Sequence, residues 1–431
     1  MSNPYELLKG VKIIELTTYV AAPSAGRLLA DWGADIIKVE ATPRGDVTRY
    51  VVPLPGMKPV AYQYHNANKR SIAVNLKTPE GQEVIHKLLE TADVFFTNTR
   101  TKALKKLGLD YETLKEQYPK LIHAQITGFG ETGPMANDPG FDNVCYWALG
   151  GPMYSSMEKG TAPIIPPSSF GDNNLACTMA GAICAALYKQ KCTGEGSKIV
   201  SSLYSQALYN MTEPLLSIQC SDQDTYPKSR LENTPLNNTY VCKDGKWIMV
   251  CCHEYERYFP SFMQIIGRED LITDPEYNTF ARGNERSREI IAILEEGFAK
   301  FTREEISQKL VEHDIPHAIV ANVPDLLESQ QAWDNKYLTR FKLHTGEEMV
   351  EAATPVKFGG VTEPPRKDAP YLGEQSTEIL TELGYGKETI DKWMEEGIVI
   401  EKREPSDLGR SEEHTSELHS RFDLVCRLLL E

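Results

Sequence analysis

The feature that most constrains the fold is a regular alternation of strand and helix patterns over the first 205 residues. Short runs rich in β-branched residues predict strands at 11–16, 35–40, 71–76, 93–98, 121–127 and 198–204. Helical patterns separate these runs, and one of them has a clear start, with Thr78 at the cap and Pro79 in the first turn. Strands that alternate with helices of this length favour a mostly parallel sheet covered by helices on both faces.

The pattern changes after about residue 222. Residues 239–252 predict a hairpin with Asp244 and Gly245 at its turn, and charged helices follow around 284–300 and 303–313. Residues 345–400 return to a strand followed by helices. The sequence therefore predicts an α/β protein with a large α/β domain over 1–222, a smaller α+β domain over 223–340, and a C-terminal return to the large domain over 341–408.

The last stretch, 409–431, does not resemble the rest of the chain. It is similar to the translation of a common sequencing adapter, so we expect a non-native tail. The alternative is a genuine amphipathic tail.

Composition and charge exclude several classes of protein. A net charge of −15 argues against a general nucleic-acid surface, although a local basic patch could still bind an anion. The longest apolar stretch, within 175–187, is too short to cross a bilayer, and the first ten residues lack the pattern of a signal peptide. Nine cysteines without paired Cys-x-x-Cys spacing fit a reduced protein. We expect a cytoplasmic protein with no metal site and no membrane or nucleic-acid partner.

Two motifs bear on ligand binding. The run GFGETG (128–133) matches the G-x-G-x-x-G pattern of dinucleotide sites, but Pro134 and Pro139 interrupt the segment where that pattern must open a helix, so turn glycines are the better interpretation. The second motif is a basic cluster at the start of a short helix that directly follows a strand: Arg100, Lys102, Lys105 and Lys106. In an acidic protein this cluster is suited to an anionic ligand such as a nucleotide phosphate, although a solvated helix face has the same pattern.

Several longer motifs, taken together, resemble the class III CoA-transferases, the CaiB/BaiF family. They are GVKIIEL…AAPSAGRLLADWGADIIKVE, PRGDVTR, NANKRSIAVNLKTPEG, TNTRTKALKKLGLD, QITGFGETGP, PGFDN and FGDNN…AGAICAAL, in that order. The resemblance covers residues 9 to about 400 and is closest to the 2-hydroxyacyl branch, such as the phenyllactate and 2-hydroxyisocaproate CoA-transferases of amino-acid-fermenting anaerobes. It implies a Rossmann-like large domain built from N- and C-terminal segments, a smaller α+β domain, and an interlocked homodimer.

The same resemblance implies the site residues. Asp172, in the Gly-Asp pair of FGDNN, corresponds to the family's catalytic nucleophile. Contacts with CoA carry over to Val20, Ala21, Val74, Lys77, Asn98, Ala103 and Lys106, and we expect Arg100 to join Lys77 and Lys106 in holding the CoA phosphates. This chain departs from the family in having Ala41 where an arginine is usual, so that Arg44 is a candidate replacement. It also lacks, near 230–260, the glycine-rich loop of some oxalate-type members.

Position alone gives Asp172 a second interpretation, because an aspartate before a helix often caps it. The two roles are compatible, since a helix N-terminus favours the carboxylate anion and attack on a thioester requires that form. Backbone amides at the helix start or near Gly171 are candidate donors to a developing oxyanion.

The resemblance implies a transferase that moves CoA from an acyl-CoA donor to a 2-hydroxy acid through an aspartyl anhydride and an aspartyl–CoA thioester. Coenzyme A is then a substrate, no cofactor is bound permanently, and a 2-hydroxyacyl-CoA dehydratase is a possible downstream partner. One alternative is an α-methylacyl-CoA racemase, but Phe141 stands where those enzymes have a histidine. Another is an inert CoA-binding subunit of a dehydratase system, which the retained Asp172 argues against.

Overall fold

The computed structural model of the chain describes residues 5–50, 60–220, 226–343, 346–359 and 366–402. The chain divides into two compact units, one of residues 1–150, 167–210 and 335–431 and the other of residues 151–166 and 211–334. The sequence analysis places the boundaries at 222/223 and 340/341, and it assigns 151–166 to the large domain. The expected tail, 409–431, lies outside the described residues.

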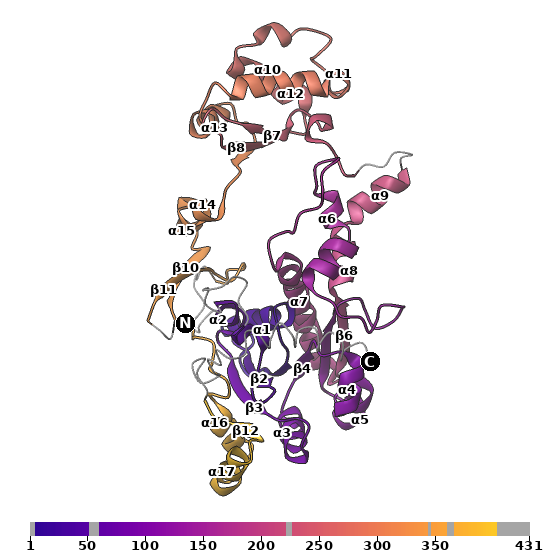
Figure 1. The fold of residues 1–431 in the computed structure, drawn as a ribbon, viewed down its shortest axis with the longest axis vertical. Helices are drawn as coiled ribbons and strands as arrows, with labels where there is room; N and C mark the ends of the chain where they lie inside the picture. The colour runs from indigo at the N-terminus through magenta and orange to yellow at the C-terminus, as the bar shows by residue number, and fades with distance from the viewer. Residues whose placement is uncertain (1–4, 51–59, 221–225, 344–345, 360–365, 403–431) are drawn as a thin grey trace, which may run out of the picture. The chain divides into compact units, whose positions relative to one another are not determined.

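A seven-stranded sheet forms the centre of the first unit (Figure 1). Its order is β12-β3-β2-β1-β4-β5-β6, and every pairing is parallel except that of β12 with β3. This confirms the mostly parallel sheet that the sequence predicts. The strands are β1 (Lys12–Leu16), β2 (Asp35–Glu40), β3 (Arg70–Val74), β4 (Val94–Thr97), β5 (Ile122–Thr127), β6 (Ser197–Ser202) and β12 (Val399–Ile400).

Side chains alternate along the strands and so divide the core of this unit between the two faces of the sheet. Ile13 packs with α1 (Ala21–Asp31), α7 (Phe170–Thr193) and α8 (Leu203–Asn210). Its neighbour Ile14 packs in a separate cluster on the other face. The helices of that cluster are α3 (Pro79–Glu90), α4 (Thr101–Leu107), α5 (Tyr111–Gln117), α16 (Ser376–Glu382) and α17 (Lys387–Glu395). Helices thus cover both faces, as predicted.

Shorter elements complete the first unit. They are the 3-10 turn η1 (Val47–Arg49), α2 (Val60–Asn66), the π-helix η2 (Asn143–Leu149), and an antiparallel pair of strands, β10 (Leu338–Lys342) and β11 (Glu348–Ala352). The predicted start of α3 is confirmed, because the Thr78 hydroxyl accepts the backbone N–H of Gly81 at 3.1 Å and Pro79 is the first helical residue.

The second unit has its own core, around a three-stranded antiparallel sheet of β7 (Asn237–Val241), β8 (Trp247–Cys251) and β9 (His317–Ile319). The predicted hairpin is confirmed, with Gly245 at φ 73° in its turn. The main covering helices are α10 (Tyr255–Ile266), α12 (Ser287–Phe298) and α13 (Arg303–Glu312). The remaining helices are α6 (Pro152–Ser155), α9 (Thr212–Cys220), η3 (Arg230–Glu232), η4 (Glu269–Leu271), α11 (Phe280–Glu285), α14 (Val323–Leu327) and α15 (Gln330–Asp334). Within the described ranges, no helix has the length and apolarity needed to span a membrane.

Candidate active site

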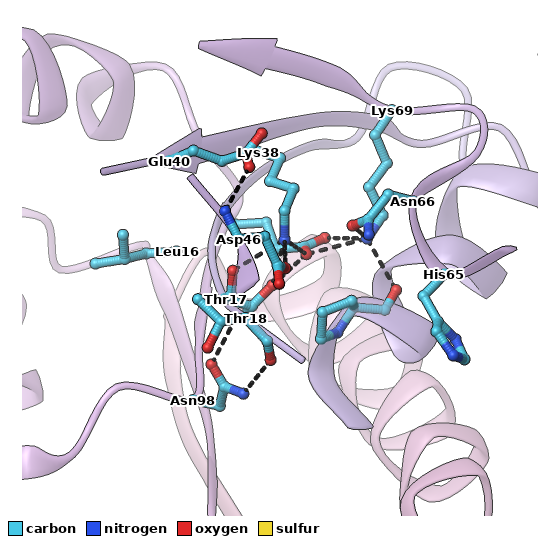
Figure 2. Close-up of polar contacts among 12 residues, drawn as sticks. Leu16, Thr17, Thr18, Lys38, Glu40, Asp46, His65, Asn66, Lys69 and Asn98 are labelled. Carbon is cyan, nitrogen blue, oxygen red and sulfur yellow. Dashed lines mark hydrogen bonds and ion pairs between the residues drawn. The ribbon is translucent and has the colours of Figure 1, made fainter. Parts of the chain in front are cut away.

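The order of the strands in the large sheet reverses between β1 and β4. The chain passes from β1 to β2 and β3 on one side, and then returns to β4 and β5 on the other. In open parallel sheets, ligands bind at such a switch point, beyond the carboxyl ends of the strands. The loops that follow β1 and β4 are joined there by Asn98, whose amide donates to the Thr18 carbonyl at 2.7 Å and accepts the Thr18 backbone N–H at 3.0 Å (Figure 2).

Two cavities lie at this edge of the sheet. The smaller, about 280 Å³, is lined by Thr18, Tyr19, Asn98, Arg100, Thr101, Ile126, Thr127, Gly128, Ala136, Asp138, Pro139, Gly140 and Phe141. The larger, about 560 Å³, is lined by Thr101, Lys102, Lys105, Lys106, Glu131, Ala136 and Asn137. The two cavities share Thr101 and Ala136, so they adjoin. Three exposed lysines of α4 make the larger cavity suitable for an anionic group.

The structure brings some of the predicted CoA contacts to these cavities but not all. Asn98 and Arg100 line the smaller one and Lys106 the larger. Val20 caps α1, Ala21 begins it, and Ala103 is half-buried on α4. Val74 and Lys77 line neither cavity: the Val74 side chain is fully buried in the core, and Lys77 is exposed beyond the end of β3.

Arg44, the candidate replacement for the missing family arginine, also lines neither cavity. It is exposed, and its guanidinium lies 5.9 Å from the centre of the Tyr50 ring. The structure therefore gives no support to that expectation.

The glycines of GFGETG serve a loop, as the sequence analysis infers. Residues 128–141 form turns and bends, with Gly130 at φ 107° and Gly133 at φ 92°. A dinucleotide motif would open an α-helix at this point, and the described chain instead continues into the π-helix η2. Gly128 and Gly140 approach closely, since a Cβ added to Gly140 would lie 2.9 Å from the Gly128 Cα. Both glycines line the smaller cavity.

Asp142, directly before η2, caps the start of α7. Its carboxylate is buried, and its Oδ1 accepts the backbone N–H of Asp172 at 3.2 Å, whereas its Oδ2 has no hydrogen-bond partner among the described residues. Gly171 makes this approach possible, because a Cβ there would lie 2.2 Å from Asp142 Oδ1. The sequence analysis missed this role, since the two aspartates are 30 residues apart and no local pattern joins them.

Asp172 is therefore not the cap of α7. It lies in the first helical turn, and its carboxylate accepts no hydrogen bond from any described residue. Burial, and then the negative charge of Asp142, raise the pKa of Asp172 to about 7. Burial and Asp142 thus oppose the ionised form of Asp172 that the helix N-terminus is expected to favour. The N–H of Asp172 donates to Asp142, which removes it as an oxyanion donor.

The model of CoA-transferase family III matches residues 8–376. The chain belongs to this family. It is 39% identical to the cinnamoyl-CoA:phenyllactate CoA-transferase of Clostridium sporogenes over 94% of this chain and all of that protein. It is 36% identical to the (R)-2-hydroxy-4-methylpentanoate CoA-transferase of Clostridioides difficile over 91% of this chain and 99% of the relative. A crystal structure of a CaiB/BaiF family protein from Brucella suis matches with a TM-score of 0.76 and 28% identity, covering 87% of this chain and 99% of that one.

In this family III CoA-transferase, two aromatic rings form one side of the smaller cavity. Tyr19 and Phe141 meet edge to face with ring centres 5.1 Å apart, and both are partly exposed. Tyr19 has φ 66°, a conformation that non-glycine residues adopt rarely and that often occurs at functional sites. Phe141 directly precedes Asp142 in the chain, although neither Asp142 nor Asp172 is among the residues that line the two cavities.

Proposed function

We propose that this enzyme transfers CoA from an acyl-CoA donor to a 2-hydroxy carboxylic acid, with Asp172 as the nucleophile. The observation that carries the proposal is the Asp172 carboxylate, which accepts no hydrogen bond from the described residues and is held on the rigid start of α7. A carboxylate without donors keeps its electron pairs available for attack on a thioester carbonyl. The adjoining cavities supply an aromatic side and a basic side for the ligand.

The reaction proceeds through four exchanges at carbonyl carbon. The Asp172 carboxylate attacks the donor thioester and releases CoA thiolate, which leaves a mixed aspartyl anhydride. The thiolate attacks the aspartyl carbonyl, forms an aspartyl–CoA thioester and releases the donor acid. The acceptor carboxylate then attacks this thioester to give a new anhydride and CoA thiolate. Finally, the thiolate attacks the acyl carbonyl of the acceptor, which yields the product thioester and regenerates Asp172.

The proposal puts each part of the substrates in one of the two cavities. The phosphates of CoA lie against the lysines of α4 in the larger cavity, where Lys106 and its neighbours provide charge-assisted hydrogen bonds. The acyl group and the acceptor occupy the region near Tyr19 and Phe141. An apolar or aromatic 2-hydroxy acid suits these rings, and the names of the two relatives, which act on phenyllactate and 2-hydroxy-4-methylpentanoate, support that class.

The test compares wild type with Asp172→Asn and Asp172→Ala. Removal of a covalent nucleophile is expected to lower turnover by several orders of magnitude, while both variants remain folded and bind CoA. Hydroxylamine added together with acyl-CoA is expected to inactivate the wild type by forming a hydroxamate at Asp172, which peptide mass spectrometry detects. Substantial transferase activity in a folded Asp172→Ala protein, without an adduct on the wild type, would contradict the mechanism.

A further inference from the structure

Six charged side chains are buried beneath the loop that joins β1 to α1. They are Glu15, Lys38, Glu40, Asp46, Arg49 and Lys69, and none is more than 7% exposed. Three are cations and three are anions, so the formal charges of the group cancel. We call this group the buried charge network.

The members of the network are tightly paired. Lys38 Nζ lies 3.0 Å from Asp46 Oδ2 (Figure 2). Lys69 Nζ lies 2.9 Å from Glu15 Oε2. Arg49 Nε donates to Glu40 Oε2 at 2.9 Å. Two positions without side chains make room for these acids, since a Cβ on Gly26 would lie 2.1 Å from Glu15 Oε2 and one on Gly45 would lie 2.6 Å from Glu40 Oε2.

Three members of the network also hold the backbone, two of them in the β1–α1 connection and the third in the first turn of α1. Lys38 Nζ donates to the Thr17 carbonyl at 2.9 Å, and Lys69 Nζ donates to the Pro23 carbonyl at 2.8 Å. Asp46 Oδ1 accepts the Tyr19 backbone N–H at 3.2 Å. The connection is thus fixed from three separate parts of the chain, and Tyr19 between these contacts keeps its unfavourable φ of 66°.

Stability alone does not explain such a network. A buried ion pair contributes little net stability compared with apolar side chains of similar volume, because desolvation of the charges offsets their attraction. Apolar side chains, however, cannot donate to a carbonyl or accept from an amide in a chosen direction. The feature that these charged groups provide is therefore the directed contact with the backbone at residues 17, 19 and 23.

We propose that Lys38, Asp46 and Lys69 are positioning residues that hold the β1–α1 loop in its ligand-binding conformation before acyl-CoA arrives. None of the three lines either cavity, whereas Thr18 and Tyr19 line the smaller one. A loop that is ordered in advance lowers the entropic cost of binding, so the network contributes to affinity without touching the ligand. The inference rests on the proposed function, because it takes acyl-CoA as the ligand of these cavities.

The test uses the double variant Lys38→Met with Asp46→Asn. It removes one charge of each sign. Glu15 loses Lys38, which lies 3.6 Å away, but stays paired with Lys69, and Glu40 stays paired with Arg49, so every remaining buried charge keeps a partner. The asparagine introduced by Asp46→Asn keeps an oxygen that can accept the Tyr19 N–H, while the Thr17 carbonyl loses its donor. We expect the dissociation constant for CoA, measured by calorimetry, to rise about tenfold. Amide hydrogen exchange at residues 18–20 is expected to become faster in the absence of ligand.

The matched control is Arg27→Met with Asp31→Asn. This pair on α1 is also buried, with Arg27 Nε 2.6 Å from Asp31 Oδ1, and neither side chain bonds to residues 17–20. The control is expected to lose stability and to keep its CoA affinity and its exchange at 18–20. If the Lys38→Met variant does not fold, Lys38→Leu with Asp46→Asn, which also leaves the Thr17 carbonyl without a side-chain donor, carries the same forecasts.

Each result bears on one of the two proposals. Failure of the wild type to bind CoA would overturn the proposed function. Binding by the wild type, with affinity and exchange unchanged in the Lys38 and Asp46 variant, would overturn the positioning role alone. Equal loss of affinity in the control and in the test variant would also overturn it, because the effect would then follow from stability.

Discussion

Asp172 and Asp142 are neighbouring carboxylates with different environments. Asp142 accepts the backbone N–H of Asp172 at the start of α7, whereas the Asp172 carboxylate accepts no hydrogen bond from the described chain. Since burial and the charge of Asp142 raise the pKa of Asp172 to about 7, a large fraction of this group is protonated in slightly acidic solution. Only the ionised form can attack a thioester, so with Asp172 as the proposed nucleophile we expect its protonation to limit the enzyme at low pH.

The first prediction concerns this pH dependence. We expect kcat/KM for acyl-CoA to rise between about pH 5 and about pH 8, with a midpoint near the pKa of Asp172 in the free enzyme. The measurement is the initial rate of transfer at low acyl-CoA concentration across this range, with unfolding followed in parallel. A rate that does not change with pH while the protein stays folded would contradict a raised pKa at the nucleophile.

Asp142 gives a second prediction at this scale. Asp142→Asn keeps a side-chain oxygen for the Asp172 N–H and removes the charge, so the pKa of Asp172 falls and the midpoint of the pH profile moves to lower pH. Asp142→Ala also removes the cap of α7, which costs about 1 kcal/mol of unfolding free energy. The pH profiles of the two variants report the effect of removing the Asp142 charge. Their thermal unfolding reports the effect of removing the cap of α7. An unchanged midpoint in Asp142→Asn would show that Asp142 does not act on Asp172 through its charge.

Sequence reasoning could single out Asp172 but could not predict its environment. The motif FGDNN points to the residue, and a helix does begin there. Whether the helix N-terminus stabilises the Asp172 anion depends on which other acid reaches it, and Asp142 arrives from a loop 30 residues earlier. A contact between distant segments has no local signal, so the motif alone does not reveal that burial and Asp142 raise the pKa of Asp172.

At the scale of elements, α4 is the part of the proposed site with the most positive charge. Lys102, Lys105 and Lys106 line the larger cavity, and Arg100 lines the smaller one just before the helix begins. These basic residues directly follow β4, a central strand of the sheet. They therefore lie at the point where the strand order reverses.

The third prediction tests this helix. Lys106→Ala is expected to raise KM for acyl-CoA about tenfold, which corresponds to the loss of roughly one charge-assisted hydrogen bond. Turnover is expected to change less than KM, because the CoA phosphates that Lys106 is proposed to hold are remote from the thioester carbonyl that reacts. Lys115→Ala is the matched control, since Lys115 is an exposed lysine of α5 that lines neither cavity and pairs with Glu112. Equal KM values for the two variants would favour a merely solvated helix face.

Elements with strong local signals could be predicted, and elements that depend on a distant partner could not. The cap and first-turn proline of α3 are read directly from Thr78 and Pro79. By contrast, β12 is two residues long and exists because Val399 and Ile400 pair with the edge of β3. Likewise, β9 has three residues and is defined by its pairing with β8. Their residues carry too little pattern of their own to identify a strand.

At the scale of the whole molecule, the first unit is assembled from segments that are distant in sequence. The C-terminal segment adds β12 to the sheet and places α16 and α17 on one of its faces. Glu351 of β11 also pairs with Arg27 of α1 at 3.4 Å and with Arg366 at 2.6 Å. The return of strand and helix patterns after residue 345 indicated such a segment. The assignment of 151–166 to the second unit depends on contacts in space, which composition does not reveal.

The last prediction tests whether the two units keep separate cores. Trp393 of α17 is buried with Ile398 and Leu380 in the first unit, and Phe298 of α12 is fully buried in the second. Trp393→Ala is expected to cost about 3–5 kcal/mol of unfolding free energy, because it removes buried contacts and leaves a cavity. Amide exchange is expected to become faster in β2 and β3 and to stay unchanged in β7 and β8, since the cores do not share residues.

Phe298→Ala is the matched control and should produce the opposite pattern, with faster exchange in β7 and β8 and protection retained in β2 and β3. Mass spectrometry of peptides from both units in the two variants measures this directly. Faster exchange throughout the chain in both variants would mean that the units unfold as one cooperative structure. In that case the C-terminal segment would stabilise the whole molecule rather than the large sheet alone.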